Sequence, residues 1–76
     1  SGHHEELLAV ASVLLQKYPL SVQLLNMSAI SHKSLGQFSK VVENFERVTQ
    51  INDKSPDAFN NLGVAYKNQG SLYFQL

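Results

Sequence analysis

The segment Ser55–Gly70, SPDAFNNLGVAYKNQG, constrains the fold of this chain most strongly because it has the composition of one amphipathic helix. Ser55 is a favourable N-cap, Pro56 suits the first helical position, and Asp57 complements the positive end of the helix dipole. The apolar residues recur at helical spacing on one face: Ala58, Phe59, Leu62, Ala65 and Tyr66. The pattern predicts a helix from Pro56 to about Gln69.

Two glycines in this segment predict where the helix ends and where it packs closely against a neighbour. Gly70 is expected to end it, because glycine is the usual residue just beyond a helix C-terminus. Gly63 stands in mid-helix, where glycine costs roughly 1 kcal/mol relative to alanine. We therefore expect Gly63 to lie at a close crossing with the helix over Phe38–Ile51. On that reasoning, Gly63→Leu should cost about 1–3 kcal/mol by overpacking.

The same pattern recurs when the chain is shifted by about 34 residues, a period typical of helical repeats. The aligned pairs share size or polarity: Gly70 with Gly36, Lys67 with Lys33, Asn60 with Asn26, Phe59 with Leu25, Gly63 with Ala29, Val64 with Ile30, and Tyr66 with His32. One period earlier, Leu7-x3-Ala11 aligns with Val41-x3-Phe45. The recurrence indicates a chain built from repeated helical units.

These residues resemble the tetratricopeptide repeat (TPR) family. Phe59-x2-Leu62-Gly63-x2-Tyr66 is similar to the aromatic-x2-Leu-Gly-x2-Tyr signature of the first repeat helix. Val41-x3-Phe45 stands where the family usually has Ala-x3-Phe, and Pro19 stands at the proline that ends a repeat. The resemblance covers about residues 4–76.

The resemblance implies an all-α fold of antiparallel helical hairpins stacked as a right-handed α-solenoid of about four helices. Besides the helix already described, the expected helices are about Glu5–Tyr18, a second helix capped by Ser21 and ending near Leu35, and about Phe38–Ile51. Glu43 and Arg47 are expected to form an i,i+4 ion pair. His32 is expected to pack in the core with one ring nitrogen hydrogen-bonded.

The implied organisation is one complete repeat flanked by two partial ones. Residues 1–4 are a tag remnant or a disordered start, 5–20 a second helix, 21–54 a complete repeat, and 55–76 a first helix with the start of the next second helix. Ser71 would cap that fifth helix. The final SLYFQL is either native or vector-derived sequence.

The composition disfavours several classes of partner and activity. The formal net charge is zero, with six basic and six acidic residues, which disfavours nucleic acid as a partner. There is no cysteine, and no apolar run is long enough for a membrane span. His3, His4 and His32 lack further ligands at metal-binding spacing. We expect a soluble, cytoplasmic protein that is not an enzyme and has no catalytic residue, metal or cofactor.

A second, more polar stripe runs beside the packing face of the second and fourth helices. In the family this face lines the concave groove of the superhelix, which implies an extended peptide as the ligand and a protein as the partner. Asparagine can both donate and accept, so it suits a peptide backbone. The expected groove residues are Gln23, Asn26, Met27, Ile30, Lys33, Asp57, Asn60, Asn61, Val64 and Lys67. Asn26 is expected beside Asn60, Ile30 beside Val64, and Lys33 beside Lys67.

Two alternatives to peptide binding remain open at this point. The stripe could be an ordinary solvated helix face. The repeats could be a structural spacer or oligomerisation arm of a larger protein, with an empty groove. In addition, the apolar rows of the first and last helices predict self-association, either by end-to-end stacking or by exchange of terminal helices.

Overall fold

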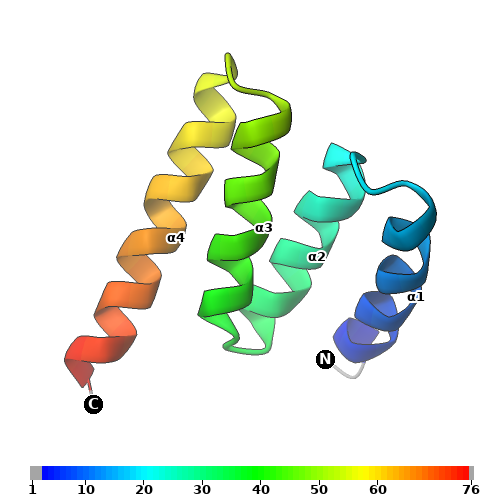
Figure 1. Cartoon of the computed structure of the whole chain (residues 1–76). Coiled ribbons are helices and arrows are strands. Elements are labelled where there is room, and N and C mark those ends of the chain that lie inside the picture. The colour runs from blue at the N-terminus through cyan, green and yellow to red at the C-terminus, as the bar shows by residue number, and fades with distance from the viewer. Residues whose placement is uncertain (1–2, 76) are drawn as a thin grey trace.

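Four α-helices make up the computed structural model, which describes the backbone of residues 3–75 and the side chains of residues 3–70. They are α1 (His3–Lys17), α2 (Val22–Ser34), α3 (Phe38–Ile51) and α4 (Pro56–Gln75), and no strand occurs over residues 3–75. The helices lie in one row, and each runs antiparallel to the next (Figure 1). The molecule measures 37 × 34 × 15 Å, so it is little thicker than one helix of about 10–12 Å. The predicted all-α fold of stacked antiparallel helices is confirmed.

Serine side chains fix the starts of two helices, as the sequence predicts. The Ser21 hydroxyl accepts a hydrogen bond from the Leu24 amide at 3.2 Å at the start of α2. The Ser55 hydroxyl accepts one from the Ala58 amide at 3.3 Å at the start of α4. Each serine satisfies a backbone donor that has no partner within its helix.

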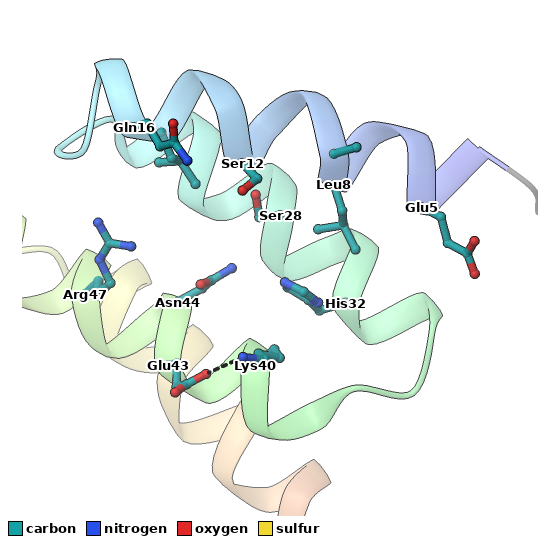
Figure 2. Close-up of a pocket in the computed structure, with 12 residues that line it drawn as sticks. Glu5, Leu8, Ser12, Gln16, Ser28, His32, Lys40, Glu43, Asn44 and Arg47 are labelled. Atoms are coloured by element: carbon teal, nitrogen blue, oxygen red, sulfur yellow. Dashed lines mark ion pairs between the residues drawn. The ribbon is translucent and has the colours of Figure 1, made fainter.

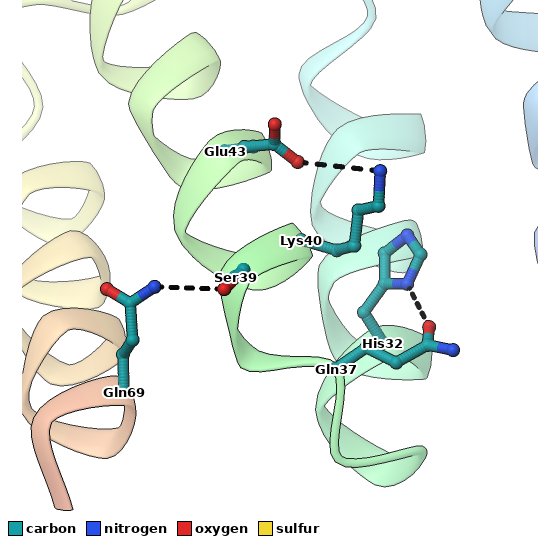
Figure 3. Close-up of polar contacts among 6 residues, drawn as sticks. All are labelled: His32, Gln37, Ser39, Lys40, Glu43 and Gln69. Atoms are coloured by element: carbon teal, nitrogen blue, oxygen red, sulfur yellow. Dashed lines mark hydrogen bonds and ion pairs between the residues drawn. The ribbon is translucent and has the colours of Figure 1, made fainter. Parts of the chain in front are cut away.

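Gly36 ends α2 in the left-handed conformation, with φ +73°. The Gln37 amide donates to the His32 carbonyl at 2.9 Å, and the Gly36 amide donates to the Lys33 carbonyl at 3.0 Å. These two bonds are those of a Schellman motif. His32 Nδ1 also lies 2.7 Å from Gln37 Oε1 (Figure 3). The expected hydrogen bond to one His32 nitrogen is therefore present, but it is exposed and His32 is half-buried, so the expected position in the core is wrong.

The core consists of two small clusters that share Phe45 of α3. One contains Ala29, Val41, Val42 and Ala65, with Leu62 packed against it. The other contains Leu25, Val48 and Ala58, with Leu15 and Val22 packed against it. α3 packs on both α2 and α4, so it joins these two helices through both clusters.

Polar bonds add to the contact between α3 and α4. The Tyr66 hydroxyl donates to Glu46 Oε2 at 2.6 Å. Gln69 Nε2 donates to Ser39 Oγ at 3.1 Å (Figure 3). These bonds lie on the exposed side of the contact and fix how the two helices are aligned along their lengths.

Two helix ends differ from the predictions. The backbone of α4 continues through Gly70 to Gln75, so the predicted helix end near Gln69 and the break before a fifth helix at Ser71 are wrong. No proline or second glycine follows Gly70 before the helix ends, so nothing in the local sequence forces a break. At the other end, α1 already begins at His3 rather than near Glu5, whereas residues 1 and 2 lie outside the described residues.

The predicted close crossing at Gly63 is also wrong. Gly63 is exposed, and a Cβ atom added to it meets nothing within 4 Å. The reason is rotational: α4 turns Ala58, Leu62 and Ala65 toward α3, which leaves Gly63 on the uncovered side. The predicted destabilisation by Gly63→Leu therefore has no basis in the packing of the single chain.

The predicted Glu43–Arg47 ion pair does not form. Arg47 Nη2 instead donates to the Pro19 carbonyl oxygen at 2.9 Å. Glu43 lies 3.8 Å from Lys40 Nζ, one helical turn earlier (Figure 3). Arg47 thereby donates to a backbone acceptor in the α1–α2 turn, which ties α3 to that turn.

Candidate binding groove

A groove lies between α2 and α4 with α3 as its floor, and it has a volume of about 340 Å³. We call it the α2–α4 groove. Its lining residues are Asn26, Ala29, Ile30 and Lys33 of α2, Val41 and Phe45 of α3, and Asn61, Val64, Ala65 and Asn68 of α4. Both α2 and α4 contribute residues at positions i, i+3, i+4 and i+7, which is one stripe of each helix.

The α2–α4 groove is apolar at its floor and polar along its walls. Ala29, Val41 and Ala65 are buried beneath it. Three asparagines and Lys33 stand along the walls, and among the described side chains, residues 3–70, no acidic residue lines it. Its volume is near the lower end of the range of about 300–1,000 Å³ typical of ligand pockets. An apolar base with a few polar groups around it suits a ligand that carries both amides and an apolar side chain.

Asn26 has a buried side-chain oxygen without a partner. Its Oδ1 atom is inaccessible and makes no hydrogen bond within the described chain. An unpaired buried acceptor costs about 1–3 kcal/mol, which a donor N–H brought to it would recover. Asn26 is thus the wall residue with the strongest physical reason to bind a ligand.

The structure brings together half of the ten groove residues expected from the sequence. Asn26, Ile30, Lys33, Asn61 and Val64 line the α2–α4 groove. The other five do not line it: Gln23, Met27, Asp57, Asn60 and Lys67, all of which are exposed. In each of the expected pairs Asn26–Asn60 and Lys33–Lys67, the α2 residue lines this groove and the α4 residue does not.

The reason is that equivalent residues of a translational repeat lie on the same side of each helix. The sides of α2 and α4 that face each other are opposite flanks, and Ile30 with Val64 is the pair related by the 34-residue shift that both flanks share. α4 presents Asn61 and Asn68 toward α2, whereas α2 presents Asn26 and Lys33 toward α4. The signal that finds Asn68 is the i+7 spacing from Asn61 rather than the 34-residue shift. Sequence reasoning also missed Ala29, Val41, Phe45 and Ala65 as lining residues.

A larger groove of about 760 Å³ lies on α1, α2 and α3 (Figure 2). Its lining includes Glu5, Leu8, Ser12, Gln16, Ser28, His32, Lys40, Glu43, Asn44 and Arg47. Most of its charged and ring groups already have contacts within the chain: Lys40 with Glu43, His32 with Gln37, and Arg47 with the Pro19 carbonyl. We therefore do not assign this groove as the candidate site.

The fold perturbs the ionisation of Tyr66. Its hydrogen bond to the Glu46 carboxylate raises the pKa of Tyr66 above 10.0, with smaller contributions from desolvation and from the negative charge of Glu46. The hydroxyl belongs to the α3–α4 contact and lies outside the α2–α4 groove. The shift has a structural cause, since the phenol must keep its proton to donate to the carboxylate.

In the part of the chain that the structure describes, no three His, Cys, Asp or Glu residues come together in a way that could hold a metal ion. No helix there combines the length and the apolar character needed to cross a bilayer.

A row of antiparallel helices whose alternate members wall a groove defines a helical-repeat protein. The family model described as TPR repeat matches residues 31–70, more than half of the chain. The chain therefore belongs to the TPR-repeat family, whose members generally mediate protein–protein interactions and are typically non-catalytic. A search of curated proteins and a search of solved structures found no match.

Proposed function

We propose that this chain is a non-catalytic interaction module that holds an extended peptide in the α2–α4 groove. Membership of the TPR-repeat family supports a protein partner. The apolar floor and the asparagine walls support a peptide, because backbone amides match the asparagines while a side chain can enter the floor.

The spacing of the groove residues sets the length of the bound segment. Asn26 and Lys33 are separated by seven residues on α2, as are Asn61 and Asn68 on α4, which is about 10 Å at 1.5 Å per residue. Extended chain rises about 3.3 Å per residue, so about three residues span the groove. The proposed segment is therefore short, and longer partners would extend beyond it.

The wall residues also favour a particular side-chain pattern. Asn26 and Asn61 stand at one end of the groove and would hold the backbone, while Ile30 and Val64 near the middle would flank an apolar side chain. Lys33 is a charged residue that lines the groove and would favour an acidic residue at the other end. The expected ligand is thus an extended segment in which an apolar residue is followed or preceded by an acidic one.

The buried, unpaired Oδ1 atom of Asn26 is the observation that carries this proposal. Asn26 lines the groove, so rotation of its side-chain amide would bring this acceptor to a peptide N–H without a change in the core. The second candidate function, a structural spacer or oligomerisation arm, is favoured by a different observation: large apolar side chains are exposed on α1 and α4 away from the groove.

Selection from a displayed peptide library, followed by affinity measurements, tests the proposal. Asn26→Ala and Asn61→Ala should each weaken binding about fivefold, which corresponds to a hydrogen bond of about 1 kcal/mol. Asn60→Ala is the matched control: it removes an exposed amide from the adjacent position outside the groove and should leave affinity unchanged.

Equal weakening by Asn60→Ala and Asn61→Ala would contradict the assignment of the α4 flank. A library that yields no binder, or binders insensitive to both Asn26→Ala and Asn61→Ala, would contradict peptide binding in this groove and favour the spacer function.

A further inference from the structure

The two ends of the helix row expose faces whose equivalents are buried inside the molecule. Leu7 and Leu14 of α1 are 43% and 38% exposed, and Phe59 of α4 is 49% exposed. Gly63 is exposed on the same side of α4, one turn from Phe59. Figure 1 places α1 and α4 at opposite ends of the row. We call Leu7 and Leu14 the α1 end face, and Phe59 and Gly63 the α4 end face.

The α2–α3 contact shows what these faces are suited to bind. A shift of 34 residues relates Phe59 and Gly63 of α4 to Leu25 and Ala29 of α2. The same shift relates Leu7 and Leu14 of α1 to Val41 and Val48 of α3. In the α2–α3 contact, Ala29 packs in one cluster with Val41, and Leu25 packs in another with Val48. All four are at most 3% exposed.

We propose that a second copy of this chain docks its α1 end face on the α4 end face, in the way that α3 packs on α2. Leu7 of one copy then lies against Gly63 of the next, and Leu14 lies against Phe59. The open space around Gly63 receives the Leu7 side chain. The contact is head-to-tail, so a pair of copies keeps one free face of each kind and the assembly can grow as an open row.

Charge and area define how strong this contact is. The chain has a formal net charge of zero, so copies approach without net repulsion. A few half-exposed side chains bury less than the roughly 1,200 Å² of a stable interface. The pairing is therefore weak and depends on concentration, with a monomer at about 10 µM and oligomers near about 1 mM.

The pairing also creates a second groove that neither copy has alone. The shift of 34 residues carries the α2 wall at Asn26 and Lys33 onto Asn60 and Lys67 of α4. It carries the α4 wall at Asn61 onto Met27 of α2. Asn60 and Lys67 of one copy would thus face Met27 of the next, which gives these exposed residues a place in a groove completed by the second copy. The pairing itself does not rest on the proposed peptide binding.

Sedimentation equilibrium of the wild-type chain from about 10 µM to about 1 mM is the first test of the pairing. The mean mass should rise with concentration. A mass that stays at the monomer value throughout overturns the proposal.

Two single variants then identify the faces. Leu7→Lys removes the α1 end face and keeps the α4 end face, whereas Gly63→Lys does the reverse. Both positions are exposed, so neither change disturbs the core, and circular dichroism checks that each variant stays helical. Each variant alone should remain monomeric at about 1 mM. Gln50→Lys, on the exposed side of α3, is the control and should associate like the wild type.

Mixing the two variants gives the sharpest result. An equimolar mixture should form a 1:1 dimer and stop there, because only one intact pair of faces is present. If Gly63→Lys still self-associates, the contact joins two α1 helices, and if Leu7→Lys still self-associates, it joins two α4 helices. Either result, or a mixture that stays monomeric, overturns the head-to-tail contact.

Discussion

Replacement of Gly63 by alanine should stabilise the single chain. Gly63 lies in the interior of α4, where glycine costs about 0.8–1.0 kcal/mol relative to alanine. The added methyl group meets nothing within 4 Å, so no overpacking offsets this gain. A gain of about 1 kcal/mol raises the melting temperature by about 4–8 °C in a domain of this size.

Thermal unfolding followed by circular dichroism at about 10 µM measures this change below the concentration at which copies pair. Gly36→Ala is the matched control, because it makes the same chemical change where φ is +73°. Alanine in that conformation costs about 1–2 kcal/mol, so Gly36→Ala should lower the melting temperature. A lower melting temperature for Gly63→Ala would refute the open environment of Gly63 and restore the close crossing predicted from the sequence.

Three further outcomes follow from the packing. Leu25→Ala should cost about 2–5 kcal/mol because Leu25 is fully buried, whereas Leu20→Ala, at a position 72% exposed, should change the unfolding midpoint in urea little. Gly70→Ala should increase the helical circular dichroism signal, because α4 continues through this position; a loss of signal would indicate that the helix ends there. The raised pKa of Tyr66 means that the hydrogen bond to Glu46 stabilises the fold below the unfolded-state pKa of about 10 and is lost as pH rises through the folded-state pKa. The stability difference between wild type and Tyr66→Phe in urea should accordingly be constant at neutral pH and vanish in strong alkali, and a difference that persists there would contradict the role of the phenol proton.

Local chemistry allowed several elements to be predicted from the sequence. The bounds of α3, Phe38–Ile51, were predicted from apolar residues at a helical period. The serine caps of α2 and α4 and the glycine that ends α2 follow from backbone requirements that a few residues satisfy. Such features depend on residues that are close together in the sequence, so the sequence alone is enough to predict them.

The features that were missed depend on how the helices rotate against one another. Gly63 was assigned to a crossing because glycine is costly in a helix, yet the sequence does not state which side of α4 faces α3. For the same reason, the sequence does not show that Asn61 lines the groove and Asn60 does not, since adjacent residues lie about 100° apart around a helix axis. A 34-residue shift identifies equivalent positions, whereas a groove brings opposite flanks together. Gly70 shows the converse case, in which a favoured helix terminator lies inside a continuous helix.

The central claim, that the α2–α4 groove binds an extended peptide, is tested most directly by NMR of the asparagine side-chain amides during titration with a selected peptide. Asn26, Asn61 and Asn68 should shift together and saturate with one affinity, because all three line the groove. Asn44, which lines the larger groove on α1, α2 and α3, should not move. Saturable shifts at Asn44, with Asn26 and Asn61 unchanged, would contradict the account and place the ligand in that other groove.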